Sequence, residues 1–240
     1  MLHQIELAFL LFLTYSFLGW TMEILLTLVR DRKFINRGFL IGPYCPIYGV
    51  GSLLMVFFLQ DYREDLIVLF CMAMVVCSIL EYTTSVIMEK LFHARWWDYS
   101  HNKFNINGRI CLETMIPFGL GGTLIVSLIH PFLLSVFAEI PSVLFHLLTG
   151  FLFGLFLLDL IVSCNIIMSF KKVATSIRKD NTEEITKRVK KVLMSKSALG
   201  KRLINAFPNL QATLGELSKK RYIFKRDKLR HEKRNRKQKF

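Results

Sequence analysis

Residues 142–168 read SVLFHLLTGFLFGLFLLDLIVSCNIIM and contain one acid, Asp159, and no Lys or Arg. The hydrocarbon core of a bilayer is spanned by roughly 20 apolar residues in a helix, so a run of this kind predicts a transmembrane helix. Working outward, four more stretches meet the same requirement: residues 5–29, 40–59, 66–88 and 110–138. We therefore expect an all-α integral membrane protein with five transmembrane helices.

The charges of the chain are divided unequally along its length. Residues 171–240 hold 23 of the 32 Lys and Arg but only 6 of the 18 Asp and Glu, whereas residues 1–170 are nearly neutral. This division predicts a transmembrane domain over 1–170 and a basic cytoplasmic tail over 171–240, and it excludes a single soluble globule. A basic amphipathic helix is expected in the tail, from Asn181 or Thr182 to about Phe207.

Basic tails have two common partners, anionic lipid and nucleic acid. Each basic residue close to an anionic leaflet gains about 1 kcal/mol, and the tail contains no recognised nucleic-acid-binding module. The sequence therefore favours membrane lipid as the partner of the tail over nucleic acid.

The basic residues of the short loops predict the orientation of the helices. Loops 30–39 and 89–109 each have four Lys or Arg, loop 60–65 has one, and the turn at 139–141 has none. Cytoplasmic loops carry the excess of Lys and Arg. We therefore expect a multi-pass protein of a bacterial cell membrane, with its N-terminus outside and its C-terminus in the cytoplasm.

Several acidic residues fall within the cytoplasmic halves of the predicted helices. Ionisable residues at membrane depth are costly, so each is a functional hypothesis by default. Glu23, Glu81 and Asp159 lie deepest, and because they come from three helices we expect them to line a shared polar pocket. Glu89 and Glu113 lie closer to the interface. The alternative, which is favoured for these last two, is that each acid caps a helix or pairs with Arg37, Arg95 or Arg109.

The first inner loop is predicted at residues 30–39 with its continuation to Gly49, and the second at 89–109 with its continuation to Glu113. Both combine helix-breaking, polar and aromatic residues. Irregular backbone at membrane depth is tolerated only where it is buried in protein or lines a water-filled cavity. The residues that we expect to bind a headgroup or polar solute there are Asn36, Arg37, Trp97, Asp98, Asn107 and Arg109. For Trp97 and its aromatic neighbours the alternative is an interfacial anchor, because Trp and Tyr favour the headgroup level.

The first two predicted hairpins resemble each other at an offset of 71 residues. Such matches indicate a parallel repeat of two hairpins plus one added helix, and repeats with a site at their interface are common in transporters. A few identities can also arise by chance. The matching pairs are Asn36 with Asn107, Pro46 with Pro117, and Gly51 with Gly122.

The motifs of common enzymes are missing from the sequence. It has no phosphate-binding loop of an ATPase, no nucleophile elbow and no zinc-binding histidine motif. Its five Cys show no zinc or disulfide spacing. We therefore predict no catalytic residue, no metal and no cofactor, and leave open whether the chain is an enzyme.

Taken together, several short motifs resemble those of the ABC-transporter type IV (CmpB-like) family of membrane proteins. The resemblance covers about residues 5–170, with weaker likeness to 210. It implies a transport-related membrane protein and brings no substrate or catalytic residue with it. The matching motifs are Phe17-Leu18-Gly19-Trp20, Asn36-Arg37-Gly38-Phe39-Leu40, Gly42-Pro43, Pro46-Ile47-Tyr48-Gly49, Glu81-Tyr82, Trp97-Asp98-Tyr99-Ser100, Asn105-Ile106-Asn107-Gly108-Arg109-Ile110 and Ala206-Phe207-Pro208-Asn209-Leu210.

These observations predict a permease-like protein with an inward-facing acidic and aromatic pocket. The acids Glu23, Glu81 and Asp159 would bind a cation, and the Gly- and Pro-containing segments would gate it. If the chain works in an ABC system, a separate ATPase subunit must supply the energy. The alternatives are an intramembrane enzyme that acts on lipid headgroups and a non-catalytic membrane scaffold.

Overall fold

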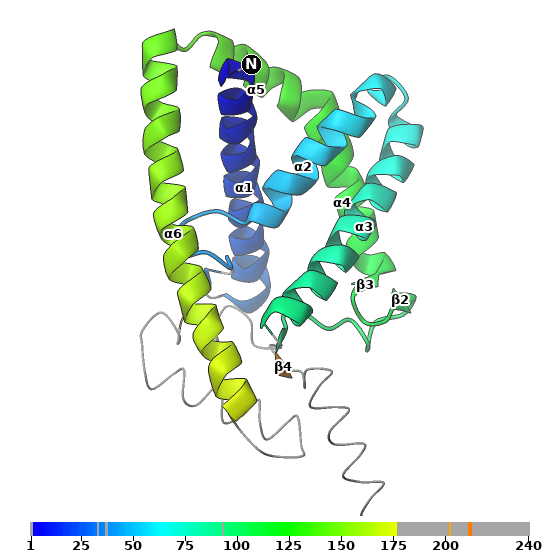
Figure 1. Cartoon of the computed structure of the whole chain (residues 1–240). Helices are drawn as coiled ribbons and strands as arrows, with labels where there is room; N and C mark the ends of the chain where they lie inside the picture. Colours follow the sequence, from blue (N-terminus) through cyan, green and yellow to red (C-terminus); the bar gives the residue numbers. More distant parts are fainter. Residues whose placement is uncertain are drawn as a thin grey trace, which may run out of the picture.

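The computed structural model describes residues 2–32, 34–36, 38–92 and 94–176, together with Arg202 and residues 211–212. Most of these residues are helical, and Figure 1 shows the helices side by side. The helices are α1 (Leu2–Asp31), α2 (Pro46–Leu59), the 3₁₀ turn η1 (Gln60–Tyr62), α3 (Leu66–Phe92), α4 (Leu112–Leu124), the π-helical turn η2 (Ile125–Ile129), α5 (His130–Ala138) and α6 (Ser142–Ser176).

Two short antiparallel ladders lie at the end of the molecule where α3 finishes and α4 begins (Figure 1). In one of them β1 (Ala94–Arg95) pairs with β4 (Gln211–Ala212). In the other β2 (Asn105–Ile106) pairs with β3 (Ile110–Cys111). The first ladder therefore joins the second inner loop to the C-terminal tail.

Four of the expected transmembrane helices are present. The segments Leu2–Val29, Leu66–Phe92, Leu112–Ala138 and Ser142–Ile166 are long and apolar enough to cross a membrane. They agree with four of the five predicted stretches to within a few residues. The chain is therefore a mostly helical, multi-pass membrane protein. Apart from Arg202, the helix expected in the tail up to Phe207 lies outside the described residues.

The prediction of a full-length helix over residues 40–59 was wrong in its first part. Helix α2 has 14 residues, which gives a length of about 21 Å at 1.5 Å per residue, short of the ~30 Å hydrocarbon core. Residues 38–45 are not helical, because Gly42-Pro43 and Pro46 interrupt the run. Pro46 takes the first helical position, where its missing N–H is harmless.

Helix α2 begins against the middle of α1, not at its end (Figure 1). The backbone N–H of Cys45 donates to the carbonyl oxygen of Ser16 at 2.9 Å. Gly49, one turn into α2, lies against the same part of α1: a Cβ at Gly49 would lie 2.5 Å from the carbonyl oxygen of Phe12 and would also overlap the Ser16 hydroxyl. The glycine therefore permits the close approach of the two helices.

Replacing Gly49 by alanine should destabilise the protein. The added methyl group meets backbone, which cannot rotate away as a side chain can, and overpacking of this kind costs about 1–3 kcal/mol. The measurement is the free energy of unfolding of the purified chain in detergent. The matched control is Gly121→Ala, because a Cβ at Gly121 meets nothing within 4 Å. Equal stability of the two variants would contradict the close approach.

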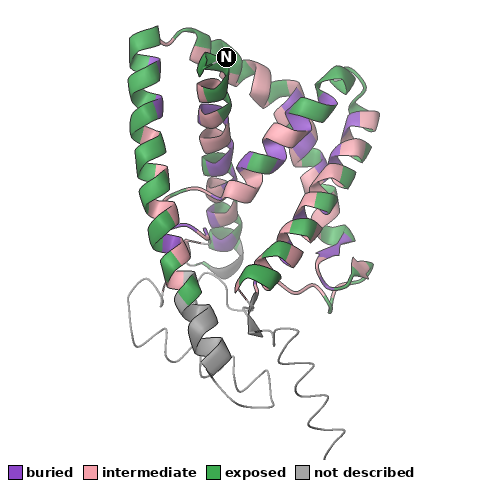
Figure 2. Cartoon of the chain, in the orientation of Figure 1, coloured by how far each residue is buried: buried purple, intermediate pink, exposed green. Residues whose placement is uncertain are grey.

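The buried core lies between α2, α3 and η2, whereas α6 is exposed along most of its length (Figure 2). Large apolar residues of α6 such as Leu147 and Phe151 are 67% and 66% exposed. In a membrane-spanning helix, such residues suit contact with lipid. The core residues are Met55, Val56, Leu59, Leu69, Ala73 and Val126.

Candidate functional site

Two deep carboxylates are each held by a tyrosine hydroxyl. Glu23 of α1 accepts a hydrogen bond from the hydroxyl of Tyr48 in α2 at 2.6 Å. Glu81 of α3 accepts one from the hydroxyl of Tyr99, in the second inner loop, at 3.1 Å, and a weaker one from Thr114 of α4 at 3.4 Å. Four helices and one loop thus contribute the polar side chains of these contacts.

Tyr99 lies within electrostatic range of both carboxylates. Burial raises the pKa of the Tyr99 hydroxyl above its ordinary value, and the charge of Glu81 and its hydrogen bond raise it further. The charge of Glu23 acts on the same hydroxyl in the same direction. Glu23 also lies within electrostatic range of Glu81. Of the three acids that the sequence placed in one pocket, these two therefore lie within electrostatic range of each other.

Glu81 is the more enclosed member of this pair. It is 7% exposed, and within the described part of the chain no Lys, Arg or His lies within 4 Å of its carboxylate. A buried carboxylate without a basic partner is costly, and a second carboxylate nearby adds to the cost. This cost makes Glu81 the strongest candidate for a functional residue among the deep acids.

Asp159, the third deep acid, has a separate set of contacts. Its Oδ1 accepts from the N–H of Ile41 at 2.9 Å and from the hydroxyl of Ser163 at 2.8 Å. Its Oδ2 accepts from the N–H of Gly42 and the hydroxyl of Tyr44, both at 2.7 Å. Asp159 therefore fastens the non-helical segment before α2 to α6.

Asn36 organises the start of the same segment. Its Oδ1 accepts from the indole N–H of Trp20 at 2.9 Å and from the N–H of Gly38 at 3.0 Å, and its amide donates to the carbonyl of Ile41 at 3.2 Å. These contacts give Asn36 a structural role in the loop. Arg37, which we expected beside it in the pocket, lies outside the described residues.

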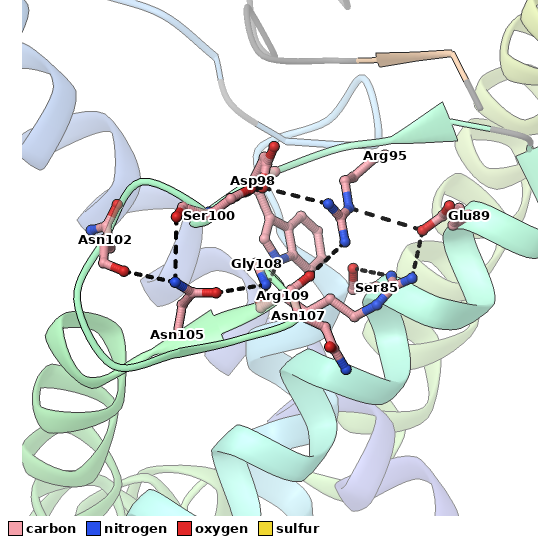
Figure 3. Close-up of polar contacts among 11 residues, drawn as sticks. Ser85, Glu89, Arg95, Asp98, Ser100, Asn102, Asn105, Asn107, Gly108 and Arg109 are labelled. Atoms are coloured by element: carbon pink, nitrogen blue, oxygen red, sulfur yellow. Dashed lines mark hydrogen bonds and ion pairs between the residues drawn. The ribbon is translucent and has the colours of Figure 1, made fainter. Parts of the chain in front are cut away.

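The second inner loop is tied to α3 by ion pairs (Figure 3). Arg109 donates to the Ser85 hydroxyl at 2.9 Å and to Glu89 at 2.6 Å. Arg95 donates to the carbonyl of Asn107 at 2.7 Å. Glu89 is therefore paired with a base, as the ion-pair alternative predicted.

Asp98 and Gly108 shape the tip of this loop (Figure 3). Asp98 accepts from both the backbone N–H and the hydroxyl of Ser100. Burial acts to raise the pKa of Asp98, but these hydrogen bonds and the charge of Arg95 outweigh it and hold the pKa below its ordinary value. Gly108 has φ +65°, and a Cβ there would lie 2.6 Å from the Asp98 carboxylate.

The remaining predicted residues of this region also contact other parts of the chain. The indole N–H of Trp97 donates to the carbonyl of Arg109 at 2.9 Å. The amide of Asn107 donates to the hydroxyl of Tyr82 at 2.9 Å. Glu113 accepts from the Asn102 amide at 2.6 Å and is exposed. These contacts build the loop and its attachment to α3 and α4.

Sequence reasoning missed the tyrosines that hold the acids. Tyr44 and Tyr48 had no predicted role, and Tyr99 was interpreted as part of an interfacial anchor. A tyrosine hydroxyl within the membrane-spanning region needs a hydrogen-bond partner, and an acid at a similar depth can accept its hydrogen bond. That signal could have linked Tyr48 to Glu23.

Other features of the described residues do not add to the site. No group of three or more His, Cys, Asp or Glu among them is placed to hold a metal ion. A hollow of about 360 Å³ lies away from the two acids, near η1 and the start of α5. Its lining residues are Gln60, Asp61, Arg63, Glu64, Val126, His130, Pro131 and Leu134.

Comparison with protein families places a match over most of the membrane domain. The model of the family described as "Putative ABC-transporter type IV" matches residues 10–164, which include all the helices of the membrane domain apart from the ends of α1 and α6. Comparison with curated proteins and with solved structures found no match.

Proposed function

This chain belongs to the ABC-transporter type IV family, and we propose that it is a permease-like membrane component whose cation site is formed by Glu23 and Glu81. The observation that carries the proposal is Glu81, which is 7% exposed and lies within electrostatic range of Glu23. The hydroxyl groups of Tyr48 and Tyr99 orient the two acids.

Electrostatics explains why a cation would bind there. Like charges within electrostatic range of each other repel, and this repulsion weakens little in a site shielded from salt. A cation between the two carboxylates replaces repulsion by attraction. A proton shared by the pair has the same effect, so protons and cations would compete for the site.

The non-helical segment before α2 supports a fifth crossing of an unusual kind. We propose that residues 34–45 cross the inner half of the membrane and that α2 crosses the outer half. The hydrogen bonds of Ile41 and Gly42 to Asp159 satisfy backbone groups that lipid could not. This arrangement keeps the N-terminus outside and the C-terminus in the cytoplasm of a bacterial cell membrane.

Two partners complete the proposal. The sequence lacks a phosphate-binding loop, so ATP hydrolysis would be supplied by a separate ATPase subunit on the cytoplasmic side. The basic tail, residues 171–240, would lie against anionic lipid as a region distinct from the transmembrane domain over 1–170. The expected repeat of two hairpins stays a prediction.

The transport role can be tested with an organic cation. We would prepare both everted and right-side-out vesicles from cells that overproduce the full chain. When ATP is supplied, vesicles of only one of the two orientations should take up radiolabelled tetraethylammonium. The double variant Glu23→Gln and Glu81→Gln should reduce uptake to background while keeping its level in the membrane. Equal uptake by the double variant would contradict a site at these acids. A change in lipid headgroup composition without any uptake would favour the lipid enzyme instead.

A further inference from the structure

The carbonyl groups of the first inner loop hold an arginine from the C-terminal tail. The Nη2 atom of Arg202 donates to the carbonyl oxygen of Leu40 at 2.5 Å and to that of Gly38 at 3.2 Å. These residues are more than 160 positions apart in the sequence. The guanidinium group therefore forms a long-range contact at the segment that precedes α2.

The same segment binds an anion through its N–H groups. Ile41 and Gly42 donate to Asp159, as described above. Burial lowers the pKa of Arg202, and the charge of Asp159 acts in the opposite direction, which places the carboxylate within electrostatic range of the guanidinium. The loop thus presents two carbonyl oxygens and, close to them, a fixed negative charge. This combination suits a cation that carries several N–H donors.

The fit of Arg202 to this site is incomplete. Its Nη1 atom is buried and has no hydrogen-bond partner among the described residues. Leaving a buried guanidinium nitrogen without an acceptor is costly, so we expect a group that only fastens the tail to have a partner for this nitrogen. A smaller or differently placed guanidinium could use the same carbonyl oxygens with less strain on its remaining donors.

We propose that the carbonyl oxygens of Gly38 and Leu40, together with Asp159, form a binding site for a guanidinium cation, and that Arg202 is its tethered occupant. The site is separate from Glu23 and Glu81, and the inference goes beyond the proposed transport role. The tail is also fixed nearby, because β4 pairs with β1. Residues 202 and 211–212 therefore contact both inner loops.

Cys45 can report whether the site is occupied. It is 7% exposed, directly follows Tyr44, and lies within electrostatic range of Arg202. In the full-length chain in detergent, we would measure its modification by a water-soluble maleimide, using mass spectrometry to separate Cys45 from the other cysteines. A water-soluble thiol peptide added to the same sample serves as the reference for reagent activity, because Cys71, although exposed, lies in the membrane-spanning helix α3.

Losing the charge of Arg202 lowers the thiolate fraction of Cys45, but loss of one charge-assisted hydrogen bond opens the segment by about tenfold or more. At a pH where all cysteines are largely thiolate, Arg202→Ala should therefore accelerate modification of Cys45 by about tenfold. Agmatine, a small guanidinium compound, should then slow it again, whereas tetramethylammonium, a cation without N–H donors, should not. In the wild type, the rate of Cys45 modification should not respond to agmatine, because Arg202 occupies the site both with and without agmatine. Lys103→Ala, which removes one positive charge from an exposed position, is the matched control and should leave the rate unchanged.

Two results would overturn the inference. A wild-type rate in Arg202→Ala would mean that Arg202 does not close the site. A faster rate that agmatine fails to reverse would mean that the contact fastens the tail and binds no free cation. If Arg202→Ala does not yield folded protein, Arg202→Gln removes the charge with a smaller change in volume and serves the same test.

Discussion

Replacing Asp159 by alanine is expected to lower the free energy of unfolding by about 3 kcal/mol or more, because it removes the acceptor for four hydrogen bonds at once. The N–H groups of Ile41 and Gly42 and the hydroxyl of Tyr44 would then lack a partner in a part of the protein that faces little water. An unsatisfied polar group costs about 1–3 kcal/mol when buried, and the lower part of this range applies here because Asp159 is only half-buried.

Two milder variants test this account of Asp159. Ser163→Ala removes a single donor and should cost about 1 kcal/mol. Asp159→Asn keeps the volume and one acceptor oxygen, so its loss should lie between those of the other two variants. Unfolding of each purified variant in detergent gives the comparison. If Asp159→Ala is no less stable than Ser163→Ala, Asp159 does not fasten the segment before α2.

Neutralising Glu81 should have opposite effects on stability and on cation binding. Glu81→Gln removes a buried charge and its repulsion with Glu23, so the variant should be at least as stable as the wild type. The same change removes an attraction of about 2–3 kcal/mol for a bound cation, which corresponds to a loss of affinity of roughly 30- to 150-fold. Glu23→Gln should act in the same direction.

Equilibrium binding of radiolabelled tetraethylammonium to the purified chain measures the second effect, and thermal unfolding measures the first. Glu113→Gln is the matched control, because Glu113 is an exposed acid of α4 that binds the Asn102 amide. Its affinity should equal that of the wild type. A Glu81→Gln variant that loses stability and keeps its affinity would show that the carboxylate has a structural role.

Hydropathy predicted the helices whose sequence is apolar without interruption. It failed at residues 40–45, because a sum over residue types takes no account of Gly42-Pro43 and Pro46, which prevent a continuous helix. The same glycine and prolines did predict irregular backbone at that depth. The error therefore lay in counting the whole of 40–59 as helix.

The positions of the acids could be predicted from the sequence, but most of their partners could not. Ser163, one helical turn from Asp159, is a local partner. Depth in the membrane follows from position along a helix, whereas Ile41, Gly42 and Tyr44 lie 115 to 118 residues from Asp159. No local pattern encodes such a contact. The Glu89–Arg109 pair was easier to anticipate, because both residues lie near the same membrane interface and have opposite charges.

The state of Glu81 in the membrane tests the central claim most directly. Dicyclohexylcarbodiimide modifies protonated carboxyl groups in apolar surroundings, and mass spectrometry can locate the modified residue. In membranes that contain the full-length chain, we expect Glu81 to be modified, and we expect tetraethylammonium to slow the reaction by about tenfold or more at saturation, because a bound cation holds the pair in its charged form. A rate of Glu81 modification that is the same with and without the cation would contradict a cation site at Glu23 and Glu81.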